Sequence, residues 1–169
     1  MKTELCQFCL RSGMLGSKCK RKLEKGEVSE LDLEIGRLLM SMEDEYPPLQ
    51  SVYFHKAIEA DGVLAIFVNR GDIAKILSYG GKIIKSVERD TKKAVRVLES
   101  NSDERKFLED LFAPMTILTV NRIWLPDGST ETRVILKGNE RRRTSRYINA
   151  LKEIAREAQG LTLRIEFAA

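Results

Sequence analysis

Two adjacent glycines, Gly80 and Gly81, stand directly before a lysine-containing run with helical spacing. A glycine lets a sugar-phosphate backbone approach the peptide closely, because no side chain holds it away. The N-terminus of a helix adds free N–H groups and a favourable dipole for a phosphate. Lys82 begins the run, and we expect Lys75 and Lys85 to lie nearby as cations. These residue types in this order predict a phosphate-binding turn.

Ser78 and Tyr79 precede the two glycines and complete a four-residue turn. A serine hydroxyl can hydrogen-bond to a phosphate, and a tyrosine ring can stack on a base. The alternative is that these four residues only join two helices and need glycine for a positive φ. The elements around the turn favour the binding interpretation.

A second candidate is a basic run at 137–147, which holds five basic side chains against one carboxylate, a local net charge of +4. Arginine binds phosphates through two parallel hydrogen bonds, and such contacts depend strongly on salt. The alternative is a solvated charged face. Because the rest of the chain is close to neutral, we expect the positive charge to be concentrated here. The basic residues of the run are Lys137, Arg141, Arg142, Arg143 and Arg146.

The three cysteines, Cys6, Cys9 and Cys19, all lie near the start of the chain. Cysteine thiolates are common zinc ligands, but structural zinc sites are almost always four-coordinate. A fourth local ligand is missing, and His55, the one histidine of the chain, has no spacing argument in its favour. The three thiolates are therefore candidate zinc ligands that lack a fourth partner. The alternative is a metal-free segment that packs on the next unit.

Composition limits the class of protein. The hydrophobic fraction of 43% supports a packed core, and the 32% of charged residues indicate a well-solvated surface. No apolar run approaches the roughly 20 residues needed to span a bilayer, and the start of the chain does not resemble a secretory signal. Cysteines confined to one end indicate a reducing compartment. We therefore expect a cytoplasmic protein without membrane contact, and its net charge of +4 suits a polyanionic partner.

The elements that must position these residues follow one order twice. The first run comprises a helix from Ser29, strands at 51–60 and 63–69, helices at 71–77 and 82–94, and a strand at 95–99. The second comprises a helix at 103–112, strands at 117–125 and 131–137, a helix at 144–158 that ends at Gly160, and a strand at 161–167. Asp-Gly pairs 66 residues apart mark a hairpin turn in each run. The pattern predicts an internal duplication.

Residues 73–84, IAKILSYGGKII, resemble the I-G-x-G-G-K-x-I pattern of type II KH domains. KH domains clamp about four nucleotides at such a loop. The whole chain resembles archaeal NusA-like proteins, which have a short Cys-containing segment followed by two KH modules. The resemblance implies an α+β sandwich with modules of order α-β-β-α-α-β. It places the Cys-containing, zinc-ribbon-like segment at 1–28, the first module at 29–100 and the second at 101–169.

The resemblance also implies a function. It indicates a factor without enzymatic activity or a required cofactor that binds single-stranded RNA and acts in transcription elongation or termination, with RNA polymerase as a partner. The implied RNA-binding residues are Lys75, Ser78, Tyr79, Gly80, Gly81, Lys82 and Lys85. The second module has no GXXG at 139–145. Either it contributes only a basic face, or Arg141, Arg142, Arg143 and Arg146 bind phosphates through their side chains.

Two alternatives stay open. The same modules would suit a protein associated with ribosomal RNA or with the small ribosomal subunit. Degenerate KH folds can also act as adaptors between proteins. No phosphate-binding Walker loop, nucleophile elbow or zinc-protease motif is present, so nothing in the sequence demands catalysis. We expect Phe112 and Trp124 to pack in the second unit, although Trp124 near the hairpin end could be a contact residue.

Overall fold

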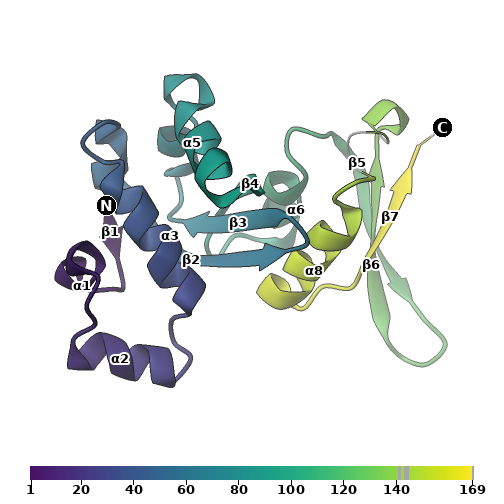
Figure 1. Cartoon of the computed structure of the whole chain (residues 1–169). Helices are drawn as coiled ribbons and strands as arrows, with labels where there is room; N and C mark the ends of the chain where they lie inside the picture. Colours follow the sequence, from purple (N-terminus) through teal and green to yellow (C-terminus); the bar gives the residue numbers. More distant parts are fainter. Residues whose placement is uncertain (141, 143–144, 169) are drawn as a thin grey trace.

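The structure is a computed structural model that describes residues 1–140, 142 and 145–168. Its described strands form two sheets of the same design (Figure 1). In each sheet an antiparallel hairpin is extended by a strand that runs parallel to the second strand of the hairpin. The fold is mixed α/β with mixed sheets, as expected for the α+β class. The repeated order of elements in the sequence therefore reappears as a repeated strand topology.

The first sheet has the order β1-β2-β3-β4, and the second has the order β5-β6-β7. The strands of the first sheet are β1 (Lys2–Thr3), β2 (Tyr53–Ala60), β3 (Val63–Val68) and β4 (Ala94–Glu99). Those of the second are β5 (Ile117–Trp124), β6 (Thr130–Leu136) and β7 (Leu163–Phe167). Both predicted hairpin turns are confirmed, with Gly62 at φ 82° and Gly128 at φ 86°.

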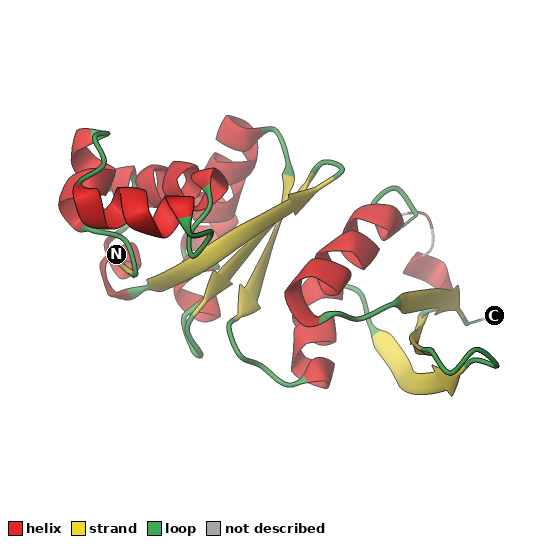
Figure 2. Ribbon diagram, turned by 90° about the horizontal axis from the view of Figure 1, so that it is seen from below, coloured by secondary structure: helices red, strands yellow, loops and turns green. Residues whose placement is uncertain are grey.

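The helices alternate with the sheets as layers (Figure 2). Helices α3, α4 and α5 cover one face of the first sheet, and α6 and α8 lie between its other face and the second sheet. The helices are α1 (Gln7–Ser12), α2 (Ser17–Glu24), α3 (Glu30–Ser41), α4 (Ile73–Ile76), α5 (Lys82–Thr91), α6 (Glu104–Phe112) and α8 (Ile148–Gln159). Short 3-10 turns are η1 (Pro47–Ser51), η2 (Tyr79–Gly81) and η3 (Gly138–Glu140).

Strand β3 is the centre of the first sheet, and every one of its residues is buried. Because successive side chains of a strand point to opposite faces, β3 contributes to two hydrophobic cores. Ile66 belongs to the core under α3, α4 and α5, whereas Phe67 belongs to the core with α6 and α8. The two repeated units are thus joined through a shared apolar layer.

Helix α3 begins with a capping box, as its sequence predicts. Ser29 accepts a hydrogen bond from the Asp32 amide, and the Asp32 carboxylate accepts one from the Ser29 amide. The buried Asp32 carboxylate also accepts the Ala57 amide at 2.7 Å. One side chain therefore fixes both the start of α3 and its position against β2.

The N-terminal segment is helical, whereas its sequence suggests a ribbon without helical periodicity. Helix α1 packs on α3, and Cys9, Leu10 and Cys19 enter the first core. The short strand β1 pairs in parallel with β2. Within the described residues, no helix is both long enough and apolar enough to cross a membrane.

Candidate nucleic-acid interface

The turn before α5 exposes bare backbone. Tyr79, Gly80 and Gly81 lie in succession in the left-handed region, at φ 58°, 63° and 80°. A Cβ on either glycine would meet nothing within 4 Å, so no other element covers this backbone. Gly81 is the N-cap of α5 and has no side chain to cap the helix. The Gly81 amide donates to the Ser78 carbonyl oxygen at 3.3 Å and the Lys82 amide to the Tyr79 carbonyl oxygen, so the uncapped amides of the first turn are those of Ile83 and Ile84. This geometry suits a phosphate at the helix start.

The side chains just before the glycines hold the turn in place. Lys75 Nζ donates to Asp72 Oδ1 at 2.9 Å and to the Ser51 carbonyl oxygen at 3.4 Å. Buried Asp72 in turn accepts the Tyr53 amide at 2.8 Å, which ties α4 to the start of β2. The Ser78 hydroxyl donates to the Lys75 carbonyl. Lys75 and Ser78, both predicted to contact RNA, are therefore engaged within the protein.

Tyr79 packs its ring against the edge of Tyr46, with 5.4 Å between ring centroids and 67° between planes. The Tyr79 side chain is nevertheless 48% exposed. Lys82 and Lys85 are also exposed, and neither forms an ion pair with any residue that the structure describes. The turn thus presents to solvent the Tyr79 ring, packed on one side, and the ammonium groups of Lys82 and Lys85, which no described carboxylate neutralises.

An apolar groove of about 330 Å³ lies beside this turn. The edge of β4 forms its floor. Helices α4 and α5 form one wall, and the end of α6 with the residues after it forms the other. The lining residues are Ile73, Leu77, Ile84, Val95, Arg96, Val97, Asp110, Ala113 and Pro114. The groove is therefore shared by both repeated units, a fact that the sequence pattern of either unit does not reveal.

The open edge of β4 offers backbone groups to the groove. Hydrogen bonds from the Ala94 and Ser100 amides to β3 and its flanking residues show that the even-numbered amides face β3. The odd-numbered residues therefore direct their N–H and C=O groups outward. Glu88 accepts from the Val95 amide and Asp110 from the Glu99 amide. Val97, between them, presents one donor and one acceptor, which complements the edge of an unstacked base.

Arg96 lies half-buried at the groove without a carboxylate partner among the described residues. Its Nε donates to the Leu111 carbonyl oxygen at 3.2 Å, and Nη1 donates to the Val95 carbonyl oxygen at 3.3 Å. Burial lowers the pKa of the Arg96 guanidinium, and Tyr147 and Glu88 partly oppose this effect. The side chain stays a cation, since arginine is not deprotonated in proteins. A desolvated cation with donors to spare suits an acceptor on a bound base or phosphate.

We expect Arg96→Met to weaken RNA binding about 10- to 100-fold, because a hydrogen bond to a charged group contributes about 1.5–3 kcal/mol. Methionine keeps the apolar stem but loses the hydrogen bonds to the Leu111 and Val95 carbonyl oxygens, so circular dichroism at the assay temperature checks that the variant stays folded. The control is Arg105→Met, which removes an exposed cation whose partner is Glu109. Fluorescence anisotropy with labelled RNA measures both variants. Equal affinity for Arg96→Met and the unchanged chain would exclude Arg96 from the interface.

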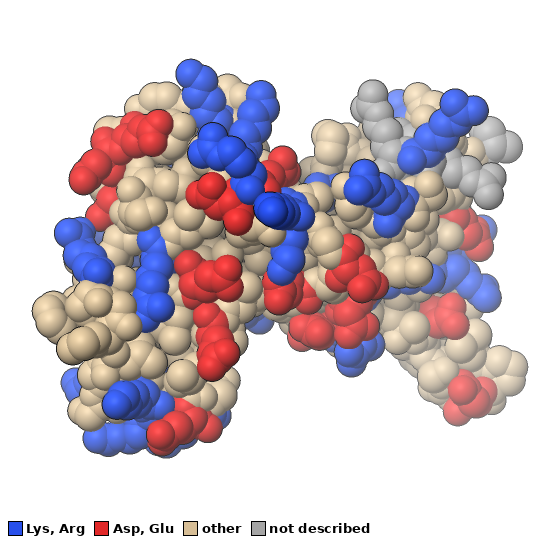
Figure 3. Space-filling model, in the orientation of Figure 1, with Lys and Arg blue, Asp and Glu red and all other residues tan. Residues whose placement is uncertain are grey.

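The predicted basic run of the second unit lies only partly within the described residues. Arg141 and Arg143 are outside them, whereas Lys137, Arg142 and Arg146 are exposed. The Arg146 guanidinium lies over the Tyr147 ring, 5.3 Å from its centroid. Figure 3 shows basic side chains over α5 and, across a hollow, over the segment before α8. The two predicted basic regions therefore lie on the same side of the molecule.

The three thiols do not form a metal site. Cys9 and Cys19 are buried, Cys6 is exposed, and Cys9 Sγ accepts the Gly16 amide at 3.3 Å. The His55 ring pairs with the Asn69 side chain instead of a thiol. In the described part of the chain, no three His, Cys, Asp or Glu side chains come close enough to hold an ion. The residues present do not fit the possible zinc site.

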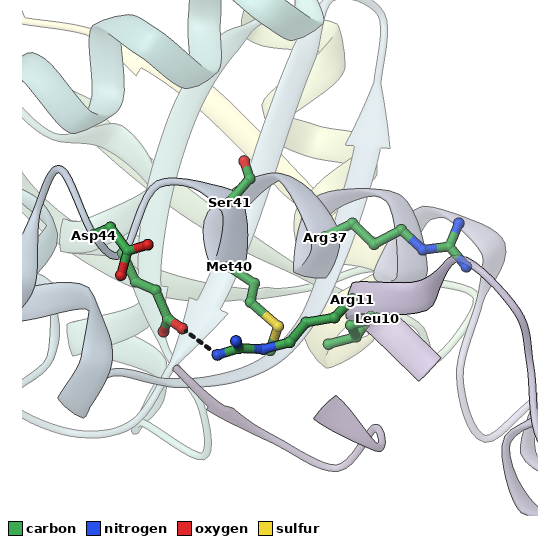
Figure 4. A pocket seen from close by; sticks show the side chains of 7 residues that line it. Leu10, Arg11, Arg37, Met40, Ser41 and Asp44 are labelled. Carbon is green, nitrogen blue, oxygen red and sulfur yellow. Dashed lines mark hydrogen bonds and ion pairs between the residues drawn. The ribbon is translucent and has the colours of Figure 1, made fainter. Parts of the chain in front are cut away.

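A second pocket, of about 350 Å³, lies between α1 and the end of α3 (Figure 4). Arg11 Nη2 donates to Glu43 Oε1 at 2.9 Å, and the Met1 amino group also pairs with Glu43. The Glu43 side chain is largely buried, although its position before two prolines suggests solvent exposure. Two cations therefore share one carboxylate here, and these contacts hold the start of the chain and α1 against the end of α3.

The expectation that Phe112 and Trp124 both pack in the second unit is half right. Phe112 is fully buried, but Trp124 is 73% exposed at the end of β5. Trp124 pairs with Thr130 next to the hairpin turn, where neither α6 nor α8 covers the sheet. Sequence alone could not place it, because the β pattern does not say how far the helices extend along the strand.

The fold and the groove define a mixed α/β protein in which two similar units share one candidate ligand-binding edge. No family model matches the chain. Its sequence is 26% identical over 96 residues to the probable transcription termination protein NusA of Methanocaldococcus jannaschii. The match covers 57% of this chain and 51% of that protein, so the chain spans about half the length of its relative. The chain is a distant relative of this archaeal protein.

Among solved structures, the chain resembles the crystal structure of APE1850, with a TM-score of 0.55 and 15% sequence identity. The superposition covers 78% of this chain and 96% of that one. At this identity the likeness concerns the fold alone.

Proposed function

We propose that this chain is a non-enzymatic factor that binds single-stranded RNA and acts in transcription elongation or termination. The RNA backbone lies against the Tyr79–Gly81 turn, and its unstacked bases enter the groove along β4. In this arrangement the two repeated units are tandem type II KH modules, and the second contributes Asp110, Ala113 and Pro114 to the groove of the first.

One observation carries the proposal. The run of three left-handed residues places uncovered backbone directly before α5, at the mouth of an apolar groove. Phosphates need accessible N–H groups, and bases need an apolar slot with a few polar groups. Both features occur side by side here. The name of the archaeal relative, a probable transcription termination protein, supports the choice of process.

The test compares single-stranded RNA with a duplex of the same sequence by fluorescence anisotropy at low salt. A groove that admits unstacked bases should bind the single strand at least about tenfold more tightly, because base stacking on protein contributes about 1–3 kcal/mol per base. Binding should also weaken as salt rises. Absence of low-salt binding to the single strand would refute the proposal.

Two alternatives lead to different partners in the cell. A protein of the small ribosomal subunit would co-sediment with that subunit rather than with RNA polymerase. An adaptor would keep a protein partner while showing no affinity for RNA. Affinity purification followed by sedimentation separates both from a transcription factor. We favour the transcription factor because the relative's name concerns termination.

A further inference from the structure

Helix α2 carries cations along one side. Lys18, Arg21, Lys22 and Lys25 are spaced at three, four and seven residues, and residues at this spacing lie on the same face of a helix. We call these four residues the α2 stripe. By the helix rise of about 1.5 Å per residue, the stripe extends over about 10 Å.

The opposite side of α2 anchors the helix to the protein. Cys19 is 3% exposed within the first core, and Leu23 packs against that core. Within the stripe, Lys22 Nζ donates to the Glu4 carbonyl oxygen at 2.8 Å. The other three stripe residues, Lys18, Arg21 and Lys25, are exposed and form no ion pair within the described part of the chain. The buried side of the helix fixes where these three residues are anchored, and no described carboxylate pairs with them.

The segment that contains the α2 stripe is one of the most positively charged parts of the chain. Residues 17–25 hold five cations against one carboxylate, a net charge of +4 that equals the charge of the whole chain. Since the run at 137–147 also carries +4, the remainder of the chain is net negative. The part of the chain outside 137–147 is therefore neutral in total, as expected, but only because the positive charge of residues 17–25 is balanced by a net negative charge in the other residues. Basic side chains gather over α2 at the lower left of Figure 3.

We propose that the α2 stripe binds the phosphate backbone of the same RNA, at nucleotides outside the segment held in the groove. This inference rests on the proposed function. A length of about 10 Å spans three intervals of the stacked spacing of about 3.4 Å, and therefore four successive phosphates for the four stripe residues. Protein interfaces are depleted in lysine and use aromatic anchors, whereas the stripe is lysine-rich and contains no aromatic residue. A polyanion therefore fits it better than a protein surface.

The position of the stripe predicts a dependence on RNA length. Helix α2 lies at the lower end of the molecule and α5 at its upper end (Figure 1). A short RNA held at the turn before α5 and in the groove has few nucleotides left with which to reach α2. Only a longer RNA that continues around the N-terminal segment gains the second contact.

The experiment measures binding of two randomised single-stranded RNA pools, of about 8 and about 30 nucleotides. The short RNA is long enough for the groove alone, whereas the long RNA can also contact a second surface. The variant combines Lys18→Gln, Arg21→Gln and Lys25→Gln. For the long pool we expect about 10- to 100-fold weaker binding at 0.1 M salt. The slope of log affinity against log salt concentration should become less steep by about 2, because each of the three lost phosphate contacts accounts for about 0.7 of that slope. For the short pool the affinity of the variant should stay within about twofold of that of the unchanged chain, because the turn before α5 and its groove alone bind an RNA of this length.

The matched control removes three exposed cations elsewhere. These are Arg105, Arg122 and Arg156, which lie outside the turn, the groove and α5, each changed to Gln. Equal losses in the variant and the control would indicate a net-charge effect and overturn the inference. Unchanged binding of the long pool would also overturn it, and a stripe that then captured an acidic protein would belong to the adaptor alternative. If neither pool binds the unmodified chain, the proposed function fails together with the inference, so the two failures are distinguishable.

Discussion

The double variant Gly80→Asp with Gly81→Asp is expected to lose RNA affinity by about 100-fold or more. Each aspartate places a carboxylate where a phosphate would lie. Loss of two charge-assisted contacts of about 1.5–3 kcal/mol each corresponds to a loss of this size. Nothing lies within 4 Å of a Cβ at either position, so the fold should persist. Each substitution in the left-handed region should cost about 1–2 kcal/mol of stability.

The control for this variant is Gly62→Asp with Gly128→Asp. These glycines also lie at positive φ, 82° and 86°, with nothing within 4 Å of a Cβ. The control therefore adds the same two charges and similar backbone strain, but in hairpin turns whose residues do not line the groove. Anisotropy titrations at equal salt compare the two variants, and circular dichroism checks their folding. If the control lost as much affinity as the variant, the turn before α5 would not be the binding site.

The second large effect concerns the core that both units share. Phe107 on α6 is fully buried among residues from both sheets. We expect Phe107→Ala to lower the free energy of unfolding by about 3–5 kcal/mol, through lost burial and the cavity left behind. The matched control is Phe8→Ala, since the Phe8 side chain is 71% exposed. That control should stay within about 0.5 kcal/mol of the unchanged chain.

Hydrogen exchange shows whether the loss spreads across the core. Strand β3 contributes Val63, Ala65 and Phe67 to the core around Phe107, so its amides should lose protection together with those of β6. Urea unfolding followed by circular dichroism gives the size of the effect. Protection lost in β6 but retained in β3 would mean that the two units unfold separately and that the groove is not a shared structure.

Local features of the fold could be predicted because their signals are local. Asp61-Gly62 and Asp127-Gly128 specify tight hairpin turns, Ser29 and Asp32 specify a helix start, and Gly160 ends α8 in the left-handed conformation expected of it. Each feature depends on the conformational preference of a few adjacent residues. The uncovered backbone at Gly80 and Gly81 follows from the same kind of signal.

Features that arise from packing between distant segments could not be predicted. The far wall of the groove comes from Ala113 and Pro114, which belong to the next unit of the repeat. Helices α1 and α2 are held by tertiary burial of a few apolar residues, among them Cys9 and Cys19, and such short helices are marginal alone. Lys75 has the residue type of a phosphate ligand, yet Asp72 engages it. For the groove and for the N-terminal helices the deciding neighbours are remote in the chain, whereas Asp72 lies only three residues before Lys75, a pairing that helix spacing could have indicated.

The most direct test of the central claim is a titration of the isotope-labelled chain with a short single-stranded RNA, followed by amide chemical shifts. We expect the largest shifts at the amides of Gly80, Gly81 and Lys82 and at Val97 on the edge of β4, with little change in α2. Shifts confined to the second sheet or to the N-terminal segment, with the turn before α5 unchanged, would contradict the claim that RNA lies on this backbone.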